Sequence, residues 1–98
     1  MSAGSADDLM NKAKALLDQL LPLHAPSGRE QEMDEACLRL LSTRAEEVRQ
    51  DAQGNVVARI CGSGGPKIGL FAHKDEIALM VSRIHDDGKM EVEPVGGC

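Results

Sequence analysis

The chain has 98 residues, a net charge of -5 and one aromatic residue, Phe71. This length suits one small domain, and the acidic balance argues against sequence-independent binding to nucleic acid, which requires a basic face. No apolar run approaches the roughly 20 residues that span a bilayer, and residues 1–8 read as a frayed end without the regions of a secretory signal. We therefore expect neither a nucleic-acid partner nor a membrane partner.

The first predicted element is an amphipathic helix over residues 6–21, in which apolar side chains recur at steps of three and four. Ser5 is placed to cap its N-terminus, and Pro22 is expected to end it. The apolar stripe is narrow, which predicts that one face of the helix packs on another element while the other face is solvated.

A second helix is expected after the loop at residues 23–30, where Ser27 and Glu30 have the spacing of a capping box. Its apolar stripe reaches about Arg44 and includes Cys37, for which burial as a small hydrophobic side chain is the favoured interpretation. The three cysteines are Cys37, Cys61 and Cys98. They are odd in number and widely spaced, which favours reduced thiols and a cytoplasmic location.

The hydrophobic period then changes to that of strands. Strands are predicted at residues 46–51 and 55–60 around a turn, at 67–72, at 77–84, and at 90–92 after a hairpin turn at 85–88. The strand at 67–72 has the most apolar run and is expected to be central. The predicted fold class is α/β, with two N-terminal helices packed on a mixed β-sheet. Such a sheet needs cover on both faces, so we expect either part of a larger α/β protein or an assembly.

The segment His73-Lys74-Asp75-Glu76 directly follows the expected central strand and carries the most informative chemistry. His73 could bind a metal while Asp75 accepts a hydrogen bond from the imidazole and fixes its orientation. The other interpretation, about equally supported by spacing alone, is a partly buried His73 hydrogen-bonded to Asp75. Glu76 fits either a carboxylate supporting such a site or a solvated loop residue.

Other polar groups have simpler interpretations. His24 is expected to be a loop residue, and His85 to belong to its hairpin turn. The glycine-rich loop at residues 62–65 lacks the order of a phosphate-binding loop and opens no predicted helix, so we reject that function. Ser27 has no paired base and is assigned to the helix cap rather than to nucleophilic catalysis.

Five stretches, at residues 23–30, 51–56, 65–68, 72–77 and 92–97, match one known family in its order and approximate spacing. The chain resembles the N-terminal part of the glutamyl and deblocking metallo-aminopeptidases, dinuclear zinc exopeptidases that assemble into tetrahedral shells. The resemblance implies that His73 is a metal ligand and that Asp75 is the catalytic residue supporting it. Lys74 and Ala78 depart from the family, whose members usually have Met and Gly there, and Lys74 sets a cation beside the expected metal site.

The resemblance also implies a domain division: residues 1–76 begin the catalytic α/β domain of a zinc exopeptidase, and residues 77–98 begin an inserted β-rich dimerisation domain. It implies two divalent metal ions, zinc or cobalt, in the full-length enzyme, a peptide substrate, and a homo-oligomer of dimers forming a larger shell. The remaining ligands and the general base would come later in the family's sequence, so the 98-residue chain should be inactive alone. No substrate-binding residue is identified.

We therefore predict a hydrolase, namely a cytoplasmic metal-dependent aminopeptidase that removes residues from the N-termini of peptides. The alternative is a non-catalytic interaction module that associates through exposed strand edges.

Overall fold

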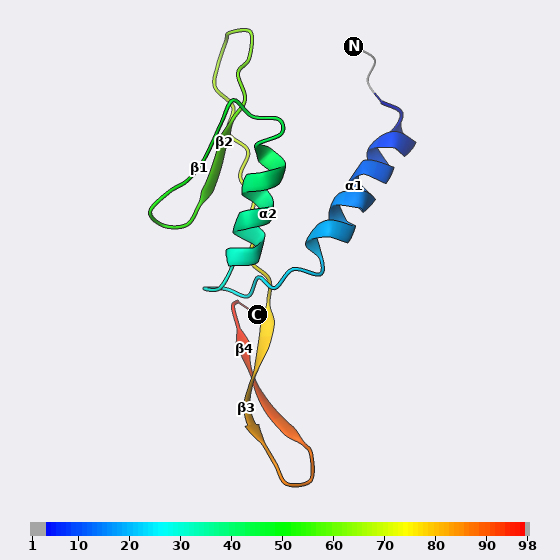
Figure 1. Ribbon diagram of the computed structural model, residues 1–98, viewed down its shortest axis with the longest axis vertical. Coiled ribbons are helices and arrows are strands. Elements are labelled where there is room, and N and C mark those ends of the chain that lie inside the picture. Colours follow the sequence, from blue (N-terminus) through cyan, green and yellow to red (C-terminus); the bar gives the residue numbers. More distant parts are fainter. Residues whose placement is uncertain (1–3, 98) are drawn as a thin grey trace.

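The computed structural model describes residues 4–97, an elongated body with extents of 63 × 36 × 22 Å. Figure 1 shows three parts: an N-terminal helix, a second helix beside a hairpin, and a C-terminal two-stranded ribbon pointing away from both. None of the helices in this described part is both long and apolar enough to cross a membrane. Of the frayed end expected at residues 1–8, residues 1–3 lie outside the described residues, as does Cys98 with its expected free thiol, whereas residues 6–8 belong to the first helix.

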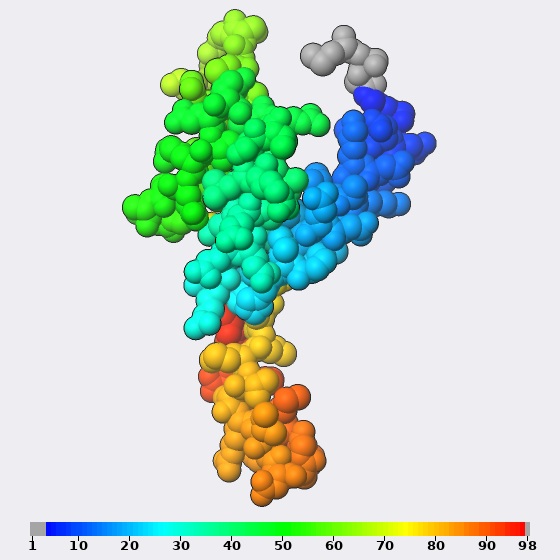
Figure 2. Space-filling view, viewed as in Figure 1, coloured from blue at the N-terminus to red at the C-terminus, as the bar shows by residue number. Residues whose placement is uncertain are grey.

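Helix α1 spans Ala6–Leu20, and its predicted cap is confirmed: the Ser5 hydroxyl accepts a 3.1 Å hydrogen bond from the Asp8 amide. None of its residues is buried. Its apolar side chains face solvent, and the space-filling view shows it projecting from the rest of the chain (Figure 2). The expectation that this helix packs on a sheet is therefore wrong for the described residues.

Helix α2 spans Gln31–Leu41 and packs on a hairpin formed by β1 (Glu47–Gln50) and β2 (Val56–Arg59). Ala36 is the buried residue of this helix. The hairpin turn predicted at residues 52–54 is confirmed, and Gly54 adopts a φ of 88° in it.

The predicted capping box is wrong. The N-cap of α2 is Glu30, which makes no side-chain cap hydrogen bond, and the Glu30 carboxylate instead accepts from the Gly28 amide at 2.8 Å. The Ser27 hydroxyl bonds to a residue far along the chain, as described below. The helix also ends at Leu41, three residues before the predicted limit at Arg44.

The α/β class is confirmed, but the strands form two separate antiparallel pairs rather than one mixed sheet. The central strand predicted at residues 67–72 is absent. Ile68, Leu70 and Phe71 are 84%, 95% and 96% exposed. In the described part the strands pair only as β1 with β2 and β3 with β4, and the segment at residues 67–72 pairs with neither hairpin. The parallel pairing that a mixed sheet requires is limited to one isolated bridge, between Pro26 and Glu76, in the described residues.

The C-terminal ribbon joins β3 (Ala78–Ile84) to β4 (Met90–Val95) through the predicted hairpin turn. The His85 amide donates to the Lys89 carbonyl at 2.8 Å, and Gly88 has a φ of 87°. Strand β4 is longer than predicted and runs past residue 92 to Val95. Most of the ribbon is exposed to solvent, and its end next to residues 96–97 returns to the loop before α2.

Candidate functional site

The candidate site begins at a two-point junction between Ala25 and Glu76. The Glu76 amide donates to the Ala25 carbonyl at 2.9 Å, and the Ala25 amide donates to the Glu76 carboxylate at 3.2 Å. Ala25 is only 1% exposed, so its amide is shielded from water. Glu76 thus fixes the loop before α2 to the start of the C-terminal ribbon, a role that the sequence did not indicate.

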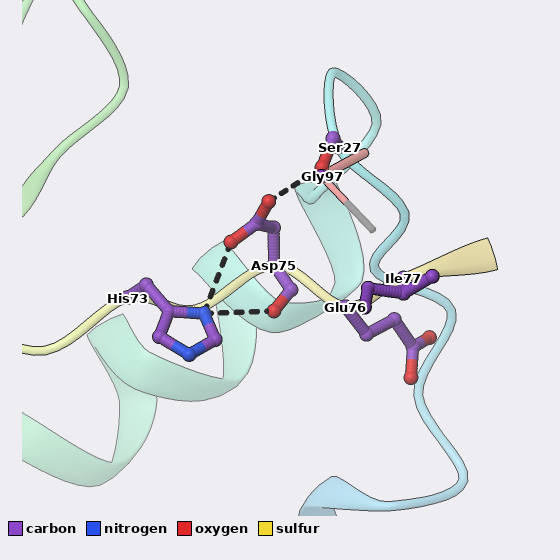
Figure 3. Close-up of a pocket in the computed structure, with 6 residues that line it drawn as sticks. All are labelled: Ser27, His73, Asp75, Glu76, Ile77 and Gly97. Carbon is purple, nitrogen blue, oxygen red and sulfur yellow. Dashed lines mark hydrogen bonds and ion pairs between the residues drawn. The ribbon is translucent and has the colours of Figure 1, made fainter. Parts of the chain in front are cut away.

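The Asp75 carboxylate lies between two partners, as Figure 3 shows. The Ser27 hydroxyl donates to Asp75 Oδ2 at 2.5 Å, and His73 Nδ1 lies 3.1 Å from Asp75 Oδ1. His73 Nδ1 also lies 3.0 Å from the Asp75 backbone carbonyl. The predicted pairing of His73 with Asp75 is therefore present, and it extends to Ser27.

These contacts fix the tautomer of His73. A carbonyl oxygen and an ionised carboxylate only accept hydrogen bonds, so Nδ1, which faces both, must carry the proton. In the neutral ring the lone pair then lies on Nε2. The His73 side chain is 86% exposed, so the interpretation of a partly buried histidine is wrong, although its hydrogen bond to Asp75 exists.

The hydrogen bond from Ser27, followed by the one from His73, holds the pKa of Asp75 below its ordinary value. Each of these bonds favours the charged form of the carboxyl group. Asp75 is therefore a carboxylate at neutral pH, able to accept from both neighbours at once.

The side chain of Lys74 has different partners. Its ammonium donates to the Gly54 carbonyl and forms an ion pair with Asp34 of α2. Lys74 therefore places its charge against α2 and the β1–β2 turn, and in the described part of the chain its ammonium forms no hydrogen bond with the His73 ring or the Asp75 carboxylate.

An open pocket of about 540 Å³ lies over these groups, lined by Ser27, His73, Asp75, Glu76, Ile77 and Gly97 (Figure 3). Gly96 borders it with a φ of 95°, and a Cβ there would lie 2.9 Å from the Ser27 hydroxyl. The pocket thus combines the loop before α2, the segment before β3 and the chain after β4. Ser27 is the residue that sequence reasoning missed; its place in one of the family-like stretches was the available signal.

One imidazole nitrogen is free to bind a metal at this site. Across residues 4–97 no group of three or more His, Cys, Asp or Glu side chains could hold a metal ion. His85 lies in the C-terminal hairpin, where its Nε2 is 2.8 Å from the Glu91 carboxylate. The described residues therefore supply one possible metal ligand, His73, and no complete metal centre.

The chain is similar to known aminopeptidases. Residues 54–98 match the family model of the M42 glutamyl aminopeptidases. The chain is 37% identical over 82 residues to FrvX of Escherichia coli (strain K12), covering 84% of this chain and 23% of that protein. It is 47% identical over 58 residues to a lysyl aminopeptidase of Pyrococcus furiosus, covering 59% of this chain and 16% of that protein.

A solved aminopeptidase from the archaeon Desulfurococcus kamchatkensis has the same fold over this region. It matches with a TM-score of 0.73 and 40% identity, covering 89% of this chain and 24% of that structure. The chain thus spans about a quarter or less of the length of these relatives.

Proposed function

Since this chain is a relative of the M42 glutamyl aminopeptidases, we propose that it contributes to a metal-dependent hydrolase removing residues from the N-termini of peptides. In this proposal His73 is a metal ligand and Asp75 is the catalytic residue that supports it. Residues 1–76 belong to the catalytic domain, and residues 77–98 begin the inserted dimerisation domain of a homo-oligomer. The reduced cysteines suit a cytoplasmic enzyme.

The observation that carries the proposal is the orientation of the His73 ring. Asp75 holds the Nδ1 proton, which leaves the Nε2 lone pair exposed beside an open pocket. A histidine that binds a metal through one nitrogen typically donates its other N–H to a carboxylate or a carbonyl, and His73 has both acceptors in reach. Ser27 in turn keeps the Asp75 carboxylate in place.

The full-length enzyme would hold two divalent ions, zinc or cobalt, which activate water and polarise the scissile carbonyl. This chain's own residues would supply one ligand, keep the His73 ring in one tautomer, and keep the supporting carboxylate ionised. The other ligands and the general base would come from the remainder of the family's length.

A chimera tests the proposal. The 98-residue chain replaces the matching region of the Desulfurococcus kamchatkensis aminopeptidase, and metal content and hydrolysis of aminoacyl p-nitroanilides are measured. We expect His73→Ala to lose bound metal and activity, while His85→Ala, which changes a histidine outside the site, keeps both. Full metal content in the His73→Ala chimera would refute the ligand role.

The 98-residue chain alone should release no product from the same substrates with zinc or cobalt added, because one imidazole cannot hold two metal ions. Turnover by the purified chain would contradict this.

A second candidate function is that of a non-catalytic interaction module. It is favoured by the unpaired outer edges of the two antiparallel pairs, β1–β2 and β3–β4, in the described part of the chain. Leu79, Met80 and Val81 of β3 are exposed, and each two-stranded ribbon has outer edges with no strand partner in the described residues. Such edges recruit other strands. Sedimentation of the chain would decide: concentration-dependent association supports this function, and a monomer at all concentrations argues against it.

A further inference from the structure

We infer that Lys74 is a positioning residue that clamps the His73–Asp75 segment to α2 and to the β1–β2 turn, and so presents the His73 ring. This inference rests on the proposed function, because it concerns how the proposed ligand is held.

The clamp is a closed polar network of four residues. The Lys74 ammonium bonds to the Gly54 carbonyl and pairs with Asp34 Oδ1. The Gln50 side-chain amide donates to Asp34 Oδ2 at 2.9 Å and to the Gly54 carbonyl at 3.1 Å. Helix α2, strand β1 and the hairpin turn are therefore joined to Lys74 through one carboxylate and one carbonyl.

The network is sheltered from water. The Lys74 and Asp34 side chains are 24% and 16% exposed, whereas the partners in the Lys89–Asp87 pair of the C-terminal turn are 84% and 57% exposed. Asp34 Oδ1 is itself shielded from solvent, and the Lys74 ammonium is its partner. A shielded charge that loses its partner is costly, while an exposed pair contributes little. The clamp should therefore hold its geometry better than a surface ion pair.

The position of the clamp explains why it would matter for His73. Among residues 62–75, all of which the structure describes, Lys74 alone forms a hydrogen bond or ion pair with α2 or with the β1–β2 hairpin. The apolar stretch before it forms no strand and is exposed, so sheet pairing does not hold the segment there. Lys74 fixes the segment from the α2 side, and Ser27 fixes it through Asp75 from the pocket side.

The test uses the ¹⁵N-labelled 98-residue chain and reads the tautomer of His73 from its ring nitrogen shifts at a fixed pH of about 8, where free histidine is neutral. The parent chain should show an excess of the Nδ1–H tautomer. Lys74→Met, which keeps length but removes the charge, should lose this excess and give the shifts of a free histidine. Asp34→Asn should have the same effect from the other partner, and Lys74→Arg should retain the excess because it keeps a cation. Lys89→Met is the matched control and should leave His73 unchanged.

Retention of the parent tautomer in both Lys74→Met and Asp34→Asn would overturn the inference, and so would a parent chain that already shows the shifts of free histidine. If Lys74→Met loses its far-ultraviolet circular dichroism, Asp34→Asn decides; loss of folding in both would overturn a positioning role in favour of a general structural one. A failure of the proposed function would be detected in a different experiment, because the His73→Ala chimera would then retain its bound metal.

Discussion

Ser27 and Asp75, separated by 48 positions in the chain, are joined by a 2.5 Å hydrogen bond from the serine hydroxyl to the carboxylate. This bond links the loop before α2 to the segment that carries His73. A carboxylate with a fixed second partner has fewer orientations available, so the direction of the His73 ring depends on a residue far away in sequence.

Replacing Ser27 with Ala should raise the pKa of Asp75 towards the ordinary value of about 3.9 for aspartate, because the bond that lowers it most is removed. A ¹³C-detected titration of the carboxyl group measures this. Ser42→Ala is the control, since the Ser42 hydroxyl bonds to the Leu38 carbonyl at the end of α2. An unchanged Asp75 midpoint in Ser27→Ala would show that the bond is not formed in solution.

Acid should release the Ser27–Asp75–His73 contacts. The folded-state pKa of Asp75 is lowered, so its contribution to stability is complete above the unfolded pKa of about 3.9 and is lost as pH falls through the folded-state pKa. The chemical shifts of Ser27, followed from pH 7 to pH 2, should therefore change below about pH 4. Shifts that stay constant to pH 2 would contradict the assignment.

Glu76→Met should destabilise the junction with Ala25, because the buried Ala25 amide loses its side-chain acceptor. An unsatisfied buried donor costs about 1–3 kcal/mol, measurable as a lower free energy of unfolding in urea. Glu93→Met, on the exposed face of β4, is the matched control and should change stability little. Equal stability of the two variants would argue that water satisfies the Ala25 amide.

Gly96→Ala and Gly88→Ala separate backbone strain from a direct clash. Both glycines have positive φ, at 95° and 87°, so each alanine should cost roughly 1–2 kcal/mol through the backbone. The new Cβ at position 96 would also press on the Ser27 hydroxyl, whereas nothing lies within 4 Å of a Cβ at position 88. Only Gly96→Ala should therefore change the His73 ring shifts, and a change in both variants would exclude the clash as the cause.

The two described cysteines should differ in thiol reactivity. Burial raises the pKa of Cys37 and keeps it protonated, although Lys74 opposes this effect, whereas Cys61 is exposed. Because the thiolate is the reactive form, Cys61 should react with Ellman's reagent faster by about an order of magnitude. In a Cys98→Ser chain, two phases of equal amplitude are expected. A single fast phase would show that the environment of Cys37 opens readily.

The elements with strong local signals were predictable. Both helices, the Ser5 cap and the two hairpins follow from periodicity and turn residues, which act over a few positions. The strand expected at residues 67–72 did not form, because an apolar run becomes a strand only when a neighbour pairs with it, and none of the described strands pairs with this run.

At the site, the His73–Asp75 pairing was predictable from proximity in sequence. The roles of Ser27, Glu76 and Lys74 were not, because each depends on a partner at least 20 positions away. The capping-box spacing at Ser27 suggested a local role, but the Ser27 hydroxyl instead bonds to the distant Asp75 carboxylate. The division at residue 76 and the ligand role of His73 remain predictions.

Lys74 binds α2 and the β1–β2 turn, whereas its neighbours His73 and Asp75 line the pocket. This arrangement makes the segment sensitive to insertion and deletion. Side chains of an extended chain alternate between two sides, so one added residue between His73 and Asp75 would disrupt their pairing or shift the lysine away from α2. A substitution changes one side chain and leaves the others in place, but a single-residue change in spacing would change which side chains face the pocket. Evolution and engineering alike should therefore find this stretch far more tolerant of new side chains than of a new length.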